Sequence, residues 1–408
     1  MNDGCCRGPE NMVLWLQTFS NECRSRMKWP DGTTMEASDV AQLTYWYMCS
    51  SRQTSLTNWN EEYSKRMKII ELKDVLGFNF LLSVKRFVRL RNRYIASGST
   101  GGVKTIILND KIRANKRVYL ENVTTEEVIS WMTHVPALDA SCSEKFELEK
   151  SRAIYGTKPL DYLIMTYVLD HLERNAGIIE GAVFRMSPAD TLRTMNHKLI
   201  SISNDFPEGA IIDYADFNIQ QTLHILAYIF QIISQAATYM GFRSNFSQAA
   251  DWCCRALLNS QISFLTPKGL VKIKQDLFSG MRWTAFCNTI LNWNYFKAAV
   301  EGLSLMLPTV TTQYVNYHQG DDVWISSKSR IWNYVLYQFM RAAVLKIVTH
   351  KQFFSRNNGE FLRILYASSQ VFGYLGRSVA SLIIKPLQSM PEIDLSAALT
   401  TKSTKLIH

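Results

Sequence analysis

The sequence predicts an α+β protein in which strands are the minority. Apolar residues recur at helical spacing in four stretches, at 217–242, 247–260, 281–302 and 331–349. Two short runs are typical of strands instead. Residues 210–212 form an apolar run that ends at an acid, and 315–325 has the pattern of a hairpin with a glycine at its turn. Helices mixed with a few strands give the α+β class.

Length and composition limit the possible classes of protein. A chain of 408 residues is long enough for two or three subdomains around a large core. Apolar content of 47% with 20% charged residues is that of a globular protein, which argues against disorder. A net charge of +10 favours a polyanionic partner, either nucleic acid or an anionic membrane. The uncharged stretch 217–242 carries several polar side chains, so it fits a buried helix better than a spanning one.

The cysteines indicate neither a disulfide framework nor a zinc site. There are eight, with no C-x-x-C pair and no Cys/His spacing suited to zinc. Reduced thiols are therefore expected. The adjacent Cys253 and Cys254 are interpreted as buried helix packing.

The most basic part of the chain covers residues 66–120. Its cations alternate with apolar residues, which is typical of a helix that packs on one face and meets phosphate with the other. A solvated charged face is the alternative. The small-residue loop 97–102 lacks the spacing of a P-loop, and no Rossmann glycine pattern is present. The cations are Lys85, Arg86, Arg89, Arg91, Arg93, Lys104, Lys111, Arg113, Lys116 and Arg117.

Acids mark both strand regions. In Gly320-Asp321-Asp322, a glycine suited to a tight turn precedes two carboxylates, and such a pair of oxygen ligands suits Mg²⁺ or Mn²⁺. The triplet alone arises by chance in about one chain in ten, so a solvated turn is the alternative. Asp213, at the end of the 210–212 run, supplies a third acid. Three acids from two strands form a cage for two divalent cations, which activate a hydroxyl and steady a leaving phosphate.

A polar stripe lies between the two acidic elements. Gly280, Thr284 and Asn288 recur every four residues, so they share one face if the segment is helical. Ser279 and Gly280 are expected in the loop at the helix start. Such a stripe can hydrogen-bond sugar hydroxyls, and a capped helix with an inward Asn is the alternative reading.

The order of these elements resembles motifs A, B and C of viral RNA-dependent RNA polymerases, most closely those of double-stranded RNA viruses of the totivirus group. Residues 145–155 resemble the basic motif F, 351–355 the end of motif D and 359–363 motif E. The resemblance runs from about residue 97 to 366. The residues that carry its central part are Asp213 and Asn218, then Ser279, Gly280, Thr284 and Asn288, then Gly320, Asp321 and Asp322.

The resemblance implies a right-hand polymerase fold with fingers and palm, and with a thumb that is truncated or minimal. It divides the chain into an N-terminal extension with fingers at 1–96, fingers with motif F at 97–205, a palm with motifs A–D at 206–358, and motif E with the start of a thumb at 359–408. We expect the fingers-palm core of a larger polymerase, or a partial reading frame.

The resemblance also implies roles for acids and cations. Asp213 and Asp321 would bind two Mg²⁺ or Mn²⁺ ions, with Asp322 in support. Lys351 would protonate the leaving pyrophosphate, with Lys346 as the alternative lysine. The remaining cations would contact the substrates: Lys150 and Arg152 the triphosphate, Lys145 the same channel, and Arg363 the primer-strand side.

Four further positions would handle the incoming nucleotide. Ser279 and Gly280 would form the flexible motif B loop. Thr284 and Asn288 would lie near the ribose, whose 2′-hydroxyl distinguishes RNA from DNA. Asn218 stands where many related polymerases carry Asp, and it can still hydrogen-bond the ribose.

The expected function is template-directed RNA synthesis from nucleoside triphosphates for viral genome replication and transcription. Expected partners are template and product RNA and, in addition, a viral capsid protein, with no membrane. The expected location is the host cytoplasm, within the virion or viral core. Three alternatives are a truncated or endogenised remnant that binds RNA without synthesis, a reverse transcriptase, and a two-metal nuclease or phosphatase.

Four residues near the acids are expected to be structural. His318 is interpreted as hairpin packing rather than a metal ligand, and Asp216 as the N-terminal residue of a helix. Tyr317 and Trp324 are expected in the core beneath the hairpin.

Overall fold

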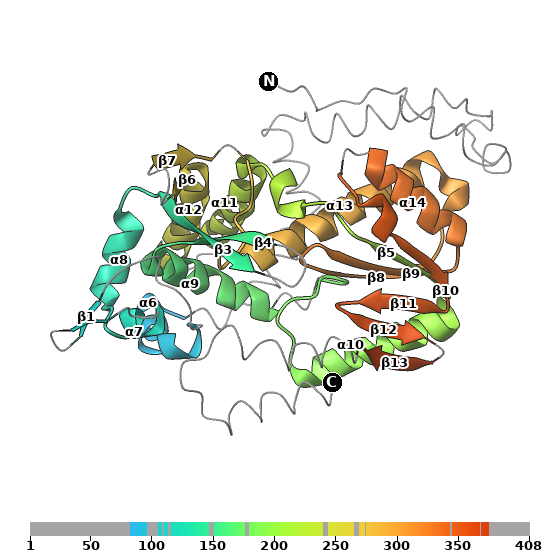
Figure 1. Ribbon diagram of the computed structural model, residues 1–408, viewed down its shortest axis with the longest axis horizontal. Helices are drawn as coiled ribbons and strands as arrows, with labels where there is room; N and C mark the ends of the chain where they lie inside the picture. Colours follow the sequence, from blue (N-terminus) through green and yellow to red (C-terminus); the bar gives the residue numbers. More distant parts are fainter. Residues whose placement is uncertain are drawn as a thin grey trace.

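The computed structural model describes residues 82–95, 105–107, 110–112, 116–146, 151–175, 179–239, 244–264, 269–273, 275–342, 345–367 and 369–374. These residues form helices and four β-sheets, so the predicted α+β class is confirmed (Figure 1). The predicted loop at 97–102 and Lys150 lie outside them.

One antiparallel sheet contains both predicted strand regions. Its order is β10-β5-β9-β8, so β5 and β9 are the central strands. β5 (Glu208–Ile212) is the strand predicted at 210–212. β8 (Tyr314–Gln319) and β9 (Asp322–Ser327) form the predicted hairpin, and β10 (Phe353–Arg356) is the edge strand beside β5.

The two faces of this sheet bury different layers. Val323 and Ile325 of β9 are fully buried in the main core, to which α13 (Thr284–Met306) and α14 (Arg330–Ala342) also contribute. Trp324 lies between them in sequence and packs in a separate small cluster, as expected for side chains that alternate across a strand. Its expected place in the core beneath the hairpin is confirmed.

The face that carries Trp324 is covered by a second, three-stranded sheet and by α10. Lys198 of α10 is buried there, with its ammonium 4.2 Å from the ring centroid of Tyr317 and 4.5 Å from that of Phe361. Cation–π attraction stabilises such a contact. The elements are α10 (Pro188–Ile200), a π-turn (Ser201–Asp205), β11 (Asn358–Phe361), β12 (Ile364–Ala367) and β13 (Gln370–Gly373).

A second four-stranded sheet, in the order β4-β3-β6-β7, lies on the other side of α13 (Figure 1). It combines strands from distant parts of the chain, because β6 pairs in parallel with β3. The strands are β3 (Leu138–Phe146), β4 (Ser151–Gly156), β6 (Ser260–Phe264) and β7 (Gly269–Lys272), and the nearby helices are α9 (Pro159–Asn175), α11 (Leu223–Tyr239) and α12 (Ser244–Leu258).

One part of the basic segment forms an amphipathic helix, whereas residues 66–81, Lys104 and Arg113 lie outside the described residues. In α6, Phe87 and Val88 are buried while Lys85, Arg86 and Arg89 are exposed, as the alternation of cations and apolar residues predicts. The other elements of this region are η1 (Arg91–Arg93), β1 (Thr105–Ile107), β2 (Asp110–Ile112), α7 (Lys116–Glu121) and α8 (Thr125–Thr133), with α6 at Val84–Arg89.

Three predicted helices have different limits in the structure. The pattern at 217–242 begins with a 3₁₀ turn, η4 (Phe217–Gln220), and α11 starts only at Leu223. The Gln220 amide donates hydrogen bonds to the carbonyls of Ala215 and Lys346, which holds the turn away from α-helical geometry. The pattern at 331–349 extends beyond α14, which ends at Ala342; residues 345–348 are not helical, and a 3₁₀ turn, η6 (Thr349–Lys351), follows them. That at 247–260 overlaps the start of β6.

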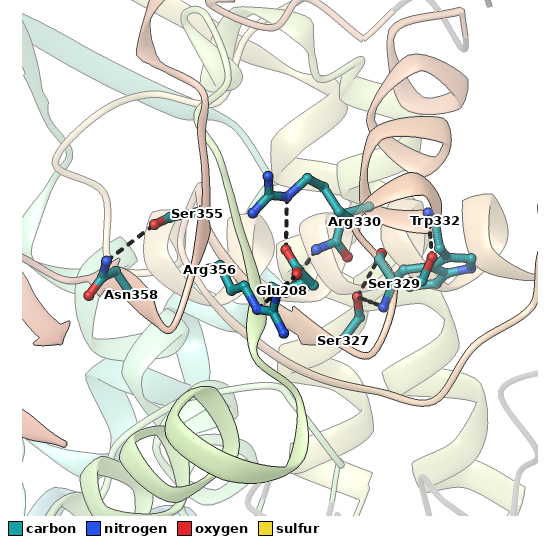
Figure 2. A network of polar contacts seen from close by, with 9 residues as sticks. Glu208, Ser327, Ser329, Arg330, Trp332, Ser355, Arg356 and Asn358 are labelled. Atoms are coloured by element: carbon teal, nitrogen blue, oxygen red, sulfur yellow. Dashed lines mark hydrogen bonds and ion pairs between the residues drawn. The ribbon is translucent and has the colours of Figure 1, made fainter. Parts of the chain in front are cut away.

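Ion pairs hold the first residue of β5, Glu208 (Figure 2). The largely buried Glu208 carboxylate lies 2.9 Å from Arg330 Nε at the start of α14 and 3.7 Å from Arg356 Nε at the end of β10. Asn333 Nδ2 donates to the Glu208 carbonyl at 2.8 Å. This network fixes the sheet at the end away from Asp213.

Two smaller findings concern the membrane and the thiols. Within the part of the chain that the structure describes, no helix combines the length and apolar character that a membrane crossing requires. Cys253 is fully buried in α12 and Cys254 partly so, which agrees with the interpretation as helix packing.

Candidate active site

Three aspartates lie at one end of the β10-β5-β9-β8 sheet, called the central sheet below. Asp213 directly follows β5, Asp321 lies in the β8–β9 turn, and Asp322 begins β9. Ile212 stands opposite Val323 in the antiparallel pairing. One further step along that register places Asp213 opposite Asp322. The backbone therefore brings the acid after β5 to the acidic turn, although the two are far apart in sequence.

The charges of the neighbouring carboxylates affect the ionisation of Asp322. Loss of hydration, followed by the negative charges of Asp321 and Asp213, raises the pKa of Asp322 to about 6, while the positive charge of Arg363 opposes the shift. Asp322 as a residue is exposed, so we attribute more of the shift to repulsion among the acids than to burial. A cation at this end of the sheet would relieve that repulsion.

Lys351 is the lysine that contacts this acidic end. Its Nζ lies 3.2 Å from Asp213 Oδ2, and both side chains are partly exposed. Gln352 holds the same backbone, since its Nε2 donates to the Asp213 carbonyl at 2.9 Å. Lys346 contributes its backbone carbonyl, which accepts from Ala215 N at 2.8 Å. Of the two candidate lysines, the side chain of Lys351 is therefore the one seen at Asp213.

The acids fit a divalent cation in chemistry but do not form a ready-made cage. Among the described residues, no group of three or more His, Cys, Asp or Glu side chains converges closely enough to hold an ion. Mutual repulsion separates carboxylates when no cation lies between them. Carboxylate oxygens are the ligands that Mg²⁺ and Mn²⁺ prefer, and the Lys351 ammonium already takes a cation's place beside Asp213.

The loop that leads into α13 is tied to strand β4. Ser279 and Gly280 lie in this loop, as predicted, and the Ser279 carbonyl accepts a hydrogen bond from Tyr155 N at 2.8 Å. Gly280 has φ +98°, and a Cβ there would lie 2.6 Å from Ile154 Cγ2. Only glycine suits both the backbone angle and the close approach.

Thr284 and Asn288 lie four residues apart in α13, so they share a face of the helix as predicted, but their side chains make different contacts. Thr284 Oγ1 donates to the Phe278 carbonyl at 2.6 Å and so closes the loop at the start of α13. Asn288 Nδ2 donates to Asn218 Oδ1 at 2.7 Å, which brings together two of the predicted ribose-contacting residues. Asn288 Oδ1 is buried and makes no hydrogen bond to the described residues.

The predicted RNA- and triphosphate-contacting cations are described only in part. Lys145 of β3 stands opposite Arg152 of β4 in the register of those strands, so their backbones are neighbours. Arg363 lies in the turn between β11 and β12 with φ +67°, and its charge reaches Asp322. The structure thus brings Arg363, a residue of the C-terminal sheet, to the acidic end of the central sheet.

The structural roles expected for three neighbouring residues can be compared with the structure. His318 is fully buried and packs against Phe296 with ring centroids 4.8 Å apart, so hairpin packing is confirmed. Burial lowers its pKa to about 3, which keeps the ring neutral. Asp216 does precede a helix, the 3₁₀ turn η4, but its side chain makes no capping hydrogen bond. Tyr317 is partly buried against the Phe361 ring.

Two residues of α13 were missed in the sequence. Thr289 Oγ1 accepts from Gly320 N at 2.8 Å, and Asn292 Nδ2 donates to the carbonyls of Gly320 and Asp322. Both side chains are buried. The available signal was their polarity within an otherwise apolar helix, where a buried polar group needs a partner.

Comparison with known proteins shows the family to which this chain belongs. Residues 86–385 match the family of viral RNA-directed RNA polymerases, and the chain belongs to that family. The resemblance to the totivirus group is also confirmed, because polymerases of such double-stranded RNA viruses are among the relatives.

Three relatives show the extent of the similarity, each named a probable RNA-directed RNA polymerase. The chain is 26% identical over 311 residues to that of Saccharomyces cerevisiae virus L-A, covering 72% of the chain and 19% of the relative. It is 25% identical over 291 residues to that of Helminthosporium victoriae virus-190S, covering 71% and 32%. With that of Leishmania RNA virus 1 - 1, isolate Leishmania guyanensis, it shares 28% over 247 residues, covering 59% and 26%. The chain therefore spans a fifth to a third of their length.

Proposed function

We propose that this chain carries the catalytic site of an RNA-dependent RNA polymerase, which adds nucleotides from nucleoside triphosphates to an RNA 3′ end as an RNA template directs. The observation that carries the proposal is the meeting of Asp213 with the Asp321–Asp322 turn at one end of the central sheet. The raised pKa of Asp322 supports it, since it marks a concentration of negative charge suited to cations.

The proposed subdomains follow the packing of the sheets. The β10-β5-β9-β8 sheet with α13 and α14 would be the palm within residues 206–358, and 359–408 would contain motif E and the start of a thumb. Residues 1–96 and 97–205 would supply the N-terminal extension and the fingers. We add residues 223–272 to the fingers, because β6 and β7 pair within the sheet that contains β3 and β4.

The proposed chemistry is a two-metal nucleotidyl transfer. Two Mg²⁺ or Mn²⁺ ions, when bound, would lower the pKa of the attacking RNA 3′-hydroxyl and neutralise charge on the leaving pyrophosphate. Asp213 and Asp321 would hold them through carboxylate oxygens, with Asp322 in support. Lys351, released from Asp213 when cations take its place, would donate a proton to the pyrophosphate.

Substrate contacts would come from three surrounding elements. Lys150 and Arg152 would bind the triphosphate, and Lys145, opposite Arg152, would line the same channel. The bonded pair Asn218 and Asn288 would hold the ribose. The Ser279–Gly280 loop with Thr284 would close over the nucleotide, and Arg363 would contact the primer strand.

The proposed setting is replication and transcription of a viral genome in the host cytoplasm, within the virion or viral core. Its support is the kinship with polymerases of double-stranded RNA viruses. Template and product RNA and nucleoside triphosphates would be the partners, and a viral capsid protein a further one.

Primer extension on an RNA template with Mg²⁺ tests the proposal. The unaltered chain should extend the primer, and Asp321→Asn should reduce extension by about 10³-fold or more, because a metal ligand is lost. Asp251→Asn is the matched control, since it removes an exposed acid of α12. RNA synthesis that survives Asp321→Asn would refute the metal assignment. Retained RNA binding with no synthesis by the unaltered chain would instead favour the remnant that binds RNA without synthesis.

A further inference from the structure

One buried amide connects the two segments that carry the acids. Asn292 of α13 is fully buried and takes part in four hydrogen bonds. Its Nδ2 donates to the carbonyls of Gly320 at 3.1 Å and Asp322 at 3.2 Å. Its Oδ1 accepts from the Tyr214 hydroxyl at 3.1 Å and lies 3.2 Å from His318 Nδ1.

The hydrogen-bonding pattern allows one orientation of the amide. Two carbonyl oxygens can only accept, so the NH₂ group of Asn292 must face Gly320 and Asp322. Its oxygen then faces His318, whose Nδ1 must carry the ring proton and donate it. The four polar positions of this side chain are therefore satisfied in a fully buried setting, where an unmade hydrogen bond costs most.

Thr289, three residues before Asn292 in α13, also bonds to the β8–β9 turn that carries Asp321. Its Oγ1 accepts from Gly320 N at 2.8 Å while donating to the Ala285 carbonyl at 2.8 Å. Gly320, with φ +61°, thus has both its N–H and its carbonyl bonded to α13. The backbone is held on both sides of Asp321, because Asp322 also accepts from Asn292.

The fourth contact reaches the other acidic segment. Tyr214 is the residue after Asp213, and its hydroxyl bond to Asn292 is buried. The Asn292 amide therefore links the side chain of Tyr214 to the backbone on both sides of Asp321. Such a link fixes the spacing of two carboxylates that would repel each other.

We infer that Asn292 is a positioning residue which, together with Thr289, sets the distance and orientation of the Asp321 turn relative to Asp213. The inference rests on the proposed function, in which these acids bind the metal ions. Residues that orient metal ligands from behind typically change metal affinity or activity by about 10- to 100-fold when altered. Asn292 would act through the backbone of the ligands and touch neither metal nor nucleotide.

The test uses variants that remove single bonds and keep the shape of the side chain. Thr289→Val deletes the acceptor for Gly320, Thr289→Ser keeps it, and Tyr214→Phe deletes one donor to Asn292. Asn292→Leu removes the whole set. Ser304→Ala is the matched control, since Ser304 lies on the same helix and its hydroxyl bonds to the Val300 carbonyl of that helix.

Mn²⁺ binding, followed by electron paramagnetic resonance, is the readout that needs no enzyme activity. We expect the Mn²⁺ dissociation constant to rise about 10- to 100-fold in Asn292→Leu and Thr289→Val, and less in Tyr214→Phe. Thr289→Ser should restore the unaltered value and Ser304→Ala should not change it. In primer extension, kcat should fall in parallel while KM for the nucleoside triphosphate stays within about threefold, because the nucleotide contacts are intact.

The outcomes separate this inference from the proposed function. Unchanged Mn²⁺ affinity in folded Thr289→Val and Tyr214→Phe would overturn the positioning role, even if the unaltered chain makes RNA. Equal losses in Thr289→Val and Thr289→Ser would also overturn it, since the hydroxyl would then be irrelevant. Mn²⁺ binding that weakens as expected, in a chain that makes no RNA, would count against the proposed function and leave the positioning role intact.

Discussion

Asp161 predicts an unusual dependence of stability on pH. This acid near the start of α9 is fully buried, and burial raises its pKa to about 7 despite a 2.9 Å hydrogen bond from Trp131 Nε1 to Oδ1. The charge of Lys158 and a hydrogen bond from its backbone also favour the ionised form of Asp161, but the loss of hydration outweighs them. The folded chain therefore keeps a proton here that the unfolded chain releases near its ordinary pKa of 3.8.

The sign and size of the effect follow from this difference. Between those two pKa values the unfolded state binds fewer protons, so stability falls as the pH rises. The contribution of protonated Asp161 to the free energy of unfolding is fully present below about pH 4 and is lost as the pH passes about 7. For a pKa of about 7 in the folded chain, the loss between pH 5 and pH 8 is about 2 to 3 kcal/mol.

The perturbation that tests this is Asp161→Asn, which keeps an acceptor for Trp131 and removes the titrating group. Urea unfolding at pH 5, 6, 7 and 8 gives the free energy of unfolding of both chains. The value for the variant minus that for the unaltered chain should rise by about 2 to 3 kcal/mol from pH 5 to pH 8. Asp251→Asn, at an exposed acid, is the control and should show no comparable gain. A stability difference for Asp161→Asn that does not change with pH would refute the reasoning.

Three further predictions concern the site. Lys351→Gln should slow nucleotide addition by about 10²-fold in rapid-quench assays if Lys351 is the proton donor, whereas Lys346→Gln should change it little. Gly280→Ala should lower the free energy of unfolding by about 1 to 3 kcal/mol and raise KM for the nucleotide, because φ +98° and the close contact both oppose a side chain. Arg282→Met should lower the free energy of unfolding in urea by about 3 kcal/mol, because it leaves the largely buried Glu173 without its partner. The two hydrogen bonds lost are each 2.7 Å long. A decrease below about 0.5 kcal/mol would contradict this.

Local patterns were enough to predict the strands that carry the acids. An apolar run that ends at Asp213 gave β5, and the glycine before Asp321 located the hairpin turn. Both depend on neighbours in sequence: alternating burial, and a backbone angle that glycine tolerates. The start of α13 was also predictable, because Ser279 and Gly280 precede a continuous helical pattern.

The errors and omissions arise from bonds between distant residues. The extra helical turn predicted at 217–222 fails because Gln220 bonds to Lys346, 126 residues away. The ion pair between Lys351 and Asp213 cannot be read from either segment alone. Asn292 and Thr289 appear in sequence merely as polar residues in an apolar helix, and their partners lie about thirty residues further along the chain. The order of the motifs singled out the acids as candidates, but the contacts that hold them are visible only in the fold.

The loop before α13 connects the two four-stranded sheets. Ser279 accepts from Tyr155 of β4, the strand that also carries Arg152, while Arg282 is fixed to α9 by the ion pair with Glu173. The helix that follows then bonds to the acidic turn through Asn292. A continuous α-helix is stiff along its axis, because each residue is bonded to the next turn. These contacts therefore connect β4 through α13 with the turn that carries Asp321. In the proposed function, α13 would hold the nucleotide-contacting and the metal-binding residues in register.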